Sequence, residues 1–177
     1  TAVLQGYQLQ RIDSWLKPLK IENIYDSSWQ LVNSLIAFTD GGIFGLGLGN
    51  SIQKYDYIPE AHNDFIGAII YEELGIFGLA LMIIPTAIII FRLLKYADQI
   101  QNNKSRVILI GIASYFMLHL FVNLGGVSGL IPMTGVPLLL VSSGGSSTIA
   151  ALIAIGIAQA IISKFNKEQL EKTDTQL

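Results

Sequence analysis

Hydrophobic side chains dominate three long stretches of the chain, and polar residues separate them. The stretches cover about residues 65–91, 107–124 and 136–162, and from residue 107 to residue 163 the sequence contains no Asp, Glu, Lys or Arg. Each stretch is close to or longer than the roughly 20 apolar residues that a helix needs to cross a bilayer. The pattern therefore predicts an all-α, polytopic membrane bundle with three transmembrane helices within residues 64–163. Pro85 predicts a kink in the first of them.

Residues 1–63 are mixed in polarity and are expected to form a large loop. Amphipathic pieces such as residues 29–38 are typical of helices that lie at the membrane surface or re-enter it. A cluster of five glycines between residues 41 and 49 predicts a tight turn with unusual backbone angles. No Lys-Ser or Lys-Thr pair follows the cluster, so it does not read as a nucleotide-binding loop.

Basic residues near the ends of the predicted spans indicate the orientation of the chain. The link at residues 92–106 carries four Lys or Arg residues against one acid, and Lys164 and Lys167 follow the third span. An excess of Lys and Arg beside a span is typical of the cytoplasmic side. The link and the polar tail at residues 164–177 are therefore expected in the cytoplasm, the tail as a disordered segment. Residues 1–63 and 125–135 are expected outside.

Composition agrees with a membrane protein and narrows its function. The chain has 51% hydrophobic and 14% charged residues, whereas soluble domains carry about 25% charged residues. Its net charge of −2 offers no basic patch for nucleic acid. The absence of cysteine excludes disulfides and Cys-based zinc sites, and no His spacing typical of a metal site is present.

Three ionisable residues, Glu60, His62 and Asp64, gather just before the first span. One hypothesis for Asp64 is that it caps the start of that helix. The other is that it acts as a general base at the membrane surface, where partial desolvation raises the pKa of a carboxyl group. The two hypotheses are compatible.

Polar residues inside the spans have two interpretations each. Glu72 and Glu73 either face a cavity or pair with a cation, or they lie shallow enough to meet water. His119 is expected to be a buried neutral side chain with one hydrogen bond rather than a ligand. Ser146 and Ser147 either allow close helix packing or line a groove for a polar headgroup.

Several motifs in order resemble the SEDS family (shape, elongation, division and sporulation). They are GLGLGNSIQK at residues 45–54, YIPEAHNDFI at residues 57–66, EELG at residues 72–75, Asn123, GLIP at residues 129–132, TGVP at residues 134–137 and SGGSS at residues 143–147. The GNSIQK form is closer to the division branch (FtsW, SpoVE) than to the elongation branch (RodA). The resemblance extends to about Lys164.

The resemblance implies a fold of about ten membrane helices, of which this chain would supply the last three and the large outer loop. It implies a peptidoglycan glycosyltransferase in the bacterial plasma membrane that polymerises lipid II at the outer face during cell division or cell-shape control. The family's essential aspartate falls on Asp64, and the family works with a class B penicillin-binding protein. This part of the chain alone is expected to be inactive.

Glycan polymerisation also predicts residues that bind the substrate. Lys54 or a divalent cation (Mg²⁺ or Mn²⁺) would stabilise the departing lipid diphosphate, although Lys54 has the alternative of extending to the membrane interface. Glu60, His62, Glu72, Glu73, Ser146 and Ser147 are further candidates for contact with substrate. Two other functions remain open: a transporter for the lipid-linked precursor that uses Glu72, Glu73 and His119, and a non-catalytic scaffold for a partner polymerase.

Overall fold

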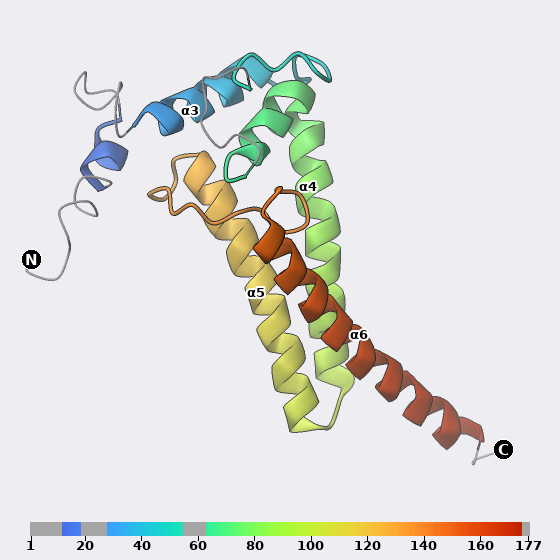
Figure 1. The fold of residues 1–177 in the computed structure, drawn as a ribbon. Coiled ribbons are helices and arrows are strands. Elements are labelled where there is room, and N and C mark those ends of the chain that lie inside the picture. Colours follow the sequence, from blue (N-terminus) through green and yellow to red (C-terminus); the bar gives the residue numbers. More distant parts are fainter. Residues whose placement is uncertain (1–11, 19–27, 55–62, 175–177) are drawn as a thin grey trace, which may run out of the picture.

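The computed structural model describes residues 12–18, 28–54 and 63–174, and every regular element in these ranges is a helix. After a short helical turn at residues 12–16, the main helices are α3 (Trp29–Gly41), α4 (Ile66–Gln99), α5 (Asn103–Val127) and α6 (Gly145–Asp174). In Figure 1, α3 lies across the end of the molecule at which α4 begins and α5 ends. The three long helices have the length and apolarity to cross a membrane, which confirms the predicted all-α membrane fold.

Small side chains bring the three long helices together. Leu93 and Ala97 of α4 form a buried cluster with Leu109 and Ala113 of α5 and Ala158 of α6. A second cluster joins Phe116, Leu139 and Ala151. Alanine at these positions lets the helix backbones approach closely, which is how membrane helices pack when lipid removes the hydrophobic drive between them.

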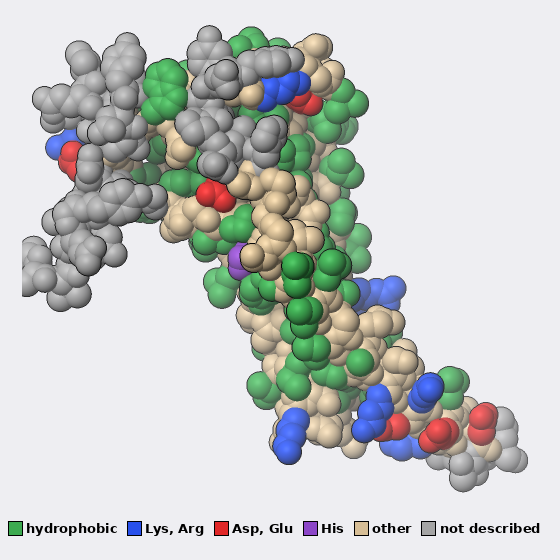
Figure 2. All heavy atoms as spheres, in the orientation of Figure 1, with side chains coloured by type: hydrophobic (Ala, Val, Ile, Leu, Met, Phe, Trp, Pro, Cys, Tyr) green, Lys and Arg blue, Asp and Glu red, His purple; other side chains and the backbone are tan. Residues whose placement is uncertain are grey.

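Most of the apolar surface of the long helices faces outward. In the most hydrophobic stretch of each helix, only 11% to 22% of the residues are buried, and Figure 2 shows hydrophobic side chains along the outside of the molecule. A helix of a soluble bundle instead turns its apolar stripe inward. The chain is therefore part of a multi-pass membrane protein, with surfaces that face lipid or other membrane helices.

The observed helices differ from the predicted spans at their ends. α6 begins at Gly145 rather than near residue 136, because Pro137 lacks a backbone N–H and residues 139–142 form turns in which Leu140 has a φ of 65°. The helix then continues to Asp174, so the expected disorder of the tail is wrong for residues 164–174. Lys, Glu and Gln in this stretch favour helix, and Lys164 pairs with Glu168 four residues later at 4.0 Å.

The interruption of α4 lies at Gly75 rather than at Pro85, where the backbone remains helical. Gly75 has φ 60° and ψ −141°. The loop after α3 supplies partners there: Ile76 N–H donates to the Ile43 carbonyl at 3.0 Å, and Leu46 N–H donates to the Glu72 carbonyl at 2.9 Å. An added Cβ at Gly75 would lie 2.3 Å from the Ile43 oxygen. The glycine is needed because its backbone angles and this close approach both exclude a side chain.

We predict that Gly75→Ala destabilises the full-length protein. The substitution combines a positive φ, which costs a non-glycine residue on the order of 1–3 kcal/mol, with a clash against the Ile43 backbone. Thermal unfolding in detergent should show a clearly lower Tm. Gly111→Ala is the matched control, since a Cβ at that α5 position meets no atom within 4 Å. Equal melting of both variants would contradict this account of the break.

Candidate functional site

A single buried amide, Asn123 of α5, joins the start of α4 to the loop that precedes α6. Its Nδ2 donates to the Asp64 carbonyl and to the Val136 carbonyl, each at 2.8 Å, and the side chain is 1% exposed. An amide has two N–H donors, and each is used for one of the two segments. Asn123 therefore fixes the backbone position of Asp64 relative to residues 128–144.

The Asp64 side chain lies against the same loop. Its Oδ2 is 3.2 Å from the position that a Cβ at Gly135 would occupy, and Gly135 has a φ of 72°. Next to it, Ser143 Oγ donates to Asn63 Oδ1 at 2.6 Å. We refer to Asn63, Asp64, Asn123, Gly135 and Ser143 as the Asp64 junction. It brings together two segments about 70 residues apart in the sequence and leaves Asp64 partly exposed.

Asp64 does not cap α4. Phe65 occupies the N-cap position, and no side chain provides a capping hydrogen bond. Phe65 is instead 2% exposed and packs against Ile69 and Val127, which anchors the start of the helix through apolar contacts. The capping hypothesis for Asp64 is therefore wrong, and the general-base hypothesis stays a prediction.

Helix α3 holds the other side of the junction. Ser34 Oγ of α3 donates to the Val127 carbonyl at 2.6 Å, at the end of α5. Trp15 Nε1 donates to the Gly129 carbonyl at 2.7 Å, at the start of the following loop. The bond from Ser34 satisfies a carbonyl that the end of α5 leaves without a helical partner. The bond from Trp15 fixes the start of the loop that follows, so the segments before α4 are tied to the segment before α6.

Glu72 forms the centre of a second polar cluster, at the break in α4. Its carboxylate is fully buried and accepts from Ser51 Oγ at 2.5 Å, from Ile52 N–H at 2.9 Å and from Gln53 N–H at 3.4 Å. Glu72 therefore does not meet water, and among the described residues it pairs with no cation, in contrast to those two sequence interpretations. The loop donors satisfy it instead, and this stabilises the turn at residues 51–54.

Glu73 does pair with a cation. Lys54 Nζ lies 2.9 Å from Glu73 Oε1, with side-chain exposures of 23% and 15%, and it also donates to the Gly49 carbonyl. Lys54 thus bends back into the loop rather than extending to the interface. This second cluster lies on the order of 10 Å along α4 from Asp64, given the rise of a helix.

The other predicted site residues that the structure describes lie outside both clusters. Glu60 and His62 fall outside the described residues. Ser146 is exposed at the start of α6, and Ser147 Oγ donates to the Gly144 carbonyl at 2.8 Å within its own turn. His119 Nδ1 lies 3.3 Å from the Pro137 carbonyl, and its ring centroid is 4.5 Å from that of Tyr115. His119 thus has the predicted hydrogen-bond contact, but it is half-buried rather than buried.

The described residues do not form an all-protein cluster of metal ligands. Among residues 12–18, 28–54 and 63–174, no three His, Asp or Glu side chains come close enough to hold a metal ion. Mg²⁺ is usually bound by one or two protein carboxylates together with waters and substrate phosphates, and among the described residues the junction offers the single carboxylate of Asp64. We assign no step of the chemistry to a metal.

Two features of the Asp64 junction are missing from the sequence-based prediction. The sequence presents Asn123 only as part of a family motif, although an amide in an otherwise apolar span already indicates a buried polar contact. The sequence likewise presents Gly135 only as part of a loop. In the structure, the positive φ of Gly135 and the short distance from its Cβ position to Asp64 Oδ2 explain why glycine occupies this position.

Comparison with known proteins gives a family and several relatives. The profile of the FtsW/RodA/SpoVE family, described as "Cell cycle protein", matches residues 1–168. A probable peptidoglycan glycosyltransferase FtsW of Bacillus subtilis is 46% identical over 165 residues, which cover 93% of this chain and 40% of the relative. Stage V sporulation protein E of the same species is 39% identical over 151 residues, 85% of this chain and 41% of the relative. The chain thus spans about two-fifths of the length of these relatives.

A solved structure, "Structural coordination of polymerization and crosslinking by a peptidoglycan synthase complex", shares the fold. The similarity covers 92% of this chain and 44% of the chain in that structure, with a TM-score of 0.68 at 24% identity. The likeness confirms the arrangement of the helices that carries the Asp64 junction.

We predict that Glu72→Gln releases the loop from the break in α4. The amide replaces one acceptor oxygen by a donor that faces Ser51 Oγ or the loop N–H groups, and an unsatisfied buried polar group costs about 1–3 kcal/mol. Thermal unfolding of the full-length protein should show a lower Tm, with earlier proteolysis in residues 42–54. Glu73→Gln is the control: its remaining oxygen still accepts from Lys54, so the loss should be smaller. A larger loss in the control would refute the central role of Glu72.

Proposed function

The chain belongs to the FtsW/RodA/SpoVE family of cell cycle proteins, the SEDS family, on its FtsW/SpoVE branch, and we propose that the full-length protein is a peptidoglycan glycosyltransferase. It polymerises lipid II into glycan strands at the outer face of the bacterial plasma membrane. The names of the relatives support this activity. The observation that carries it within this chain is the Asp64 carboxylate, held where the two outer segments meet.

In this proposal Asp64 is the catalytic residue and acts as general base. Its carboxylate takes the proton of the acceptor sugar hydroxyl while that oxygen forms a bond to the anomeric carbon of the donor. The bond from the anomeric carbon to the lipid diphosphate breaks, and the diphosphate leaves with the electron pair. A base positioned before the reaction contributes because no reorganisation is needed as the proton moves. The bonds of Asn123 to the Asp64 and Val136 carbonyls supply that positioning.

The cluster around Glu72 has a supporting part in the proposal. Glu72 and Glu73 hold the turn at residues 51–54, which leads through residues 55–62 to the Asp64 junction. Lys54 would stabilise the departing diphosphate only after it leaves Glu73. Glu60, His62, Ser146 and Ser147 remain candidates for contact with the sugars or the headgroup.

The proposed partner is a class B penicillin-binding protein, which would crosslink the strands that this protein makes. Support comes from the similar structure, which is described as a synthase complex with coordinated polymerisation and crosslinking, and from the family resemblance. A transporter would need Glu72, Glu73 and His119 along a path. Each of them instead makes a fixed internal bond, which disfavours that alternative.

We predict that Asp64→Asn in the full-length protein abolishes polymerisation without loss of insertion or of partner binding. Asparagine keeps the size and the backbone position but cannot accept a proton at neutral pH, so the rate should fall by the roughly 10²–10⁴-fold typical of general-base removal. The measurement is the yield of glycan strands from labelled lipid II with a partner whose transpeptidase is blocked.

Two controls accompany Asp64→Asn. Asp40→Asn changes an exposed carboxylate at the same end of the molecule and should leave the yield near wild type, and Glu60→Gln should cost less than Asp64→Asn. Near-normal yield from Asp64→Asn would move catalysis elsewhere in the protein. Lipid II transfer across vesicles without polymer would indicate a transporter, and partner activation alone would indicate a scaffold.

We also predict that Ile52 lies outside the cell and Gln101 in the cytoplasm. Ile52 is 53% exposed in the loop at the α3 end, whereas Gln101 is exposed in the turn between α4 and α5; Ser51 is fully buried and unsuitable as a probe. With single cysteines in an otherwise cysteine-free full-length protein, an impermeant thiol reagent should label the Ile52→Cys variant in intact cells. The Gln101→Cys variant should react only after lysis. The reverse pattern would invert the topology.

A further inference from the structure

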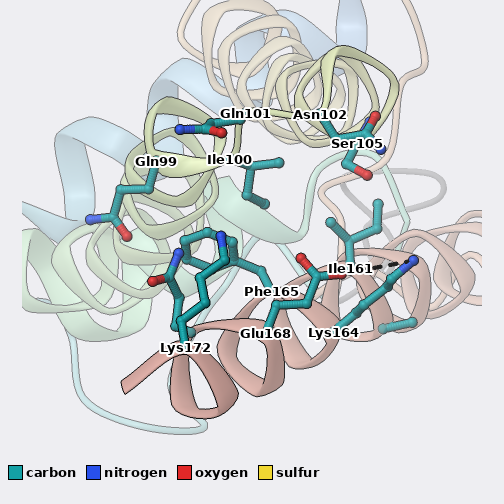
Figure 3. A pocket seen from close by; sticks show the side chains of 12 residues that line it. Gln99, Ile100, Gln101, Asn102, Ser105, Ile161, Lys164, Phe165, Glu168 and Lys172 are labelled. Atoms are coloured by element: carbon teal, nitrogen blue, oxygen red, sulfur yellow. Dashed lines mark hydrogen bonds and ion pairs between the residues drawn. The ribbon is translucent and has the colours of Figure 1, made fainter. Parts of the chain in front are cut away.

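A cavity of about 470 Å³ lies at the end of the molecule opposite the Asp64 junction, between the α4–α5 turn and α6. Figure 3 shows its lining: side chains from the end of α4 and from the turn face the last turns of α6. Amide groups of Gln99, Gln101 and Asn102 form one side, and Lys164 and Lys172 rise from the other.

The floor of the cavity is apolar. Ile100 is 6% exposed, and Ile161 and Phe165 of α6 pack against the same cluster. Phe165 also meets Tyr96 edge-on, with ring centroids 6.4 Å apart. An apolar floor below a rim of ammonium and amide donors suits an amphipathic molecule with a negative head and an apolar tail.

The net charge at this end of the molecule indicates the charge of the headgroup that would bind in the cavity. From residue 92 to residue 174 the chain has seven basic and four acidic residues, a net charge of +3, whereas the described residues before position 92 include two basic and five acidic residues, a net charge of −3. Figure 2 shows Lys and Arg side chains gathered at this end. The net positive charge of this end therefore favours an anionic head over a cationic one.

One acid, Glu168, also lines the cavity. It lies 4.0 Å from Lys164, and the two side chains are 54% and 80% exposed. Exposed ion pairs of this kind contribute little and are easily replaced. Glu168 thus leaves Lys164 available for a stronger anionic partner, with Lys172 on the same helix about two turns further along.

We propose that this cavity binds the phosphate headgroup of an anionic phospholipid, with one acyl chain along the apolar floor. Lys164 and Lys172 pair with the phosphate, and the amides at the end of α4 and in the turn donate to its oxygens or to the glycerol hydroxyls. The position at the ends of three membrane-crossing helices favours a lipid over a soluble anion, because the lipid is already held at that depth. The site is independent of the proposed glycan chemistry, since it shares no residue with the Asp64 junction.

The test uses purified, delipidated full-length protein and native mass spectrometry. Phosphatidylglycerol and phosphatidylcholine with the same acyl chains are titrated separately, and phosphatidylglycerol should bind at least about tenfold more tightly. Each Lys near an anionic lipid surface is worth about 1 kcal/mol, so Lys164→Gln with Lys172→Gln should weaken phosphatidylglycerol binding by roughly 10- to 30-fold at 1.4 kcal/mol per tenfold. Glu168→Gln should strengthen it.

The matched control is Lys104→Gln with Lys167→Gln, which removes the same charge at the same end from residues that do not line the cavity. It should retain most of the binding. Equal losses of phosphatidylglycerol binding in both double variants would show that only the general surface charge matters, and would refute the proposed site. Equal affinity of the wild type for the two lipids, or absence of binding because another part of the protein fills the cavity, would overturn it as well. Glycerol phosphate without acyl chains should bind far more weakly, and binding as tight as that of the lipid would refute the lipid assignment.

Discussion

A helix interrupted in an apolar environment must find new partners for the backbone groups that the interruption releases, and this requirement organises the end of the molecule that carries Asp64. At Gly75 the loop after α3 provides them through the Ile43 carbonyl and the N–H groups of Leu46 and Gly47. Irregular backbone at membrane depth is tolerated only where protein buries it. Gly45 follows from that contact, since a Cβ there would lie 2.2 Å from the Glu73 carbonyl oxygen.

Two buried polar side chains fix the backbone between the break in α4 and the Asp64 junction through hydrogen bonds. The Glu72 carboxylate accepts hydrogen bonds from residues 51–53, and the Asn123 amide donates to the carbonyls of Asp64 and Val136. Both lie among apolar side chains, where a hydrogen bond is stronger and an unsatisfied group more costly than in water. The carboxylate of Asp64 is therefore presented by a backbone that is fixed on both sides, while its side chain stays partly exposed.

The opposite end of the described part of the molecule is held together by apolar helix packing and carries surface charge instead of buried polar side chains. Helix α6 buries only Ala151 and Ala158 among its residues, and it meets α4 and α5 through small and aromatic side chains near the α4–α5 turn. Basic residues gather there without a buried polar network among the described residues. Long-range attraction of anions can act at such a surface, whereas positioning of a single reactive group requires the fixed contacts found around Asp64.

The sequence by itself determined the fold class, the number of membrane-crossing helices and the family, because long apolar runs and ordered motifs are local properties of the chain. It also identified Asp64 as the candidate base. Tertiary structure decided what no local pattern contains: that Phe65 rather than Asp64 begins α4, that Glu72 is satisfied by residues about 20 positions earlier, and that the helix breaks at Gly75 and not at Pro85. These outcomes depend on which distant backbone groups come within hydrogen-bonding distance, and helix propensity carries no information about that. The same holds for Asn123, whose amide could be read as polar from the sequence but whose two carbonyl partners exist only in the folded protein.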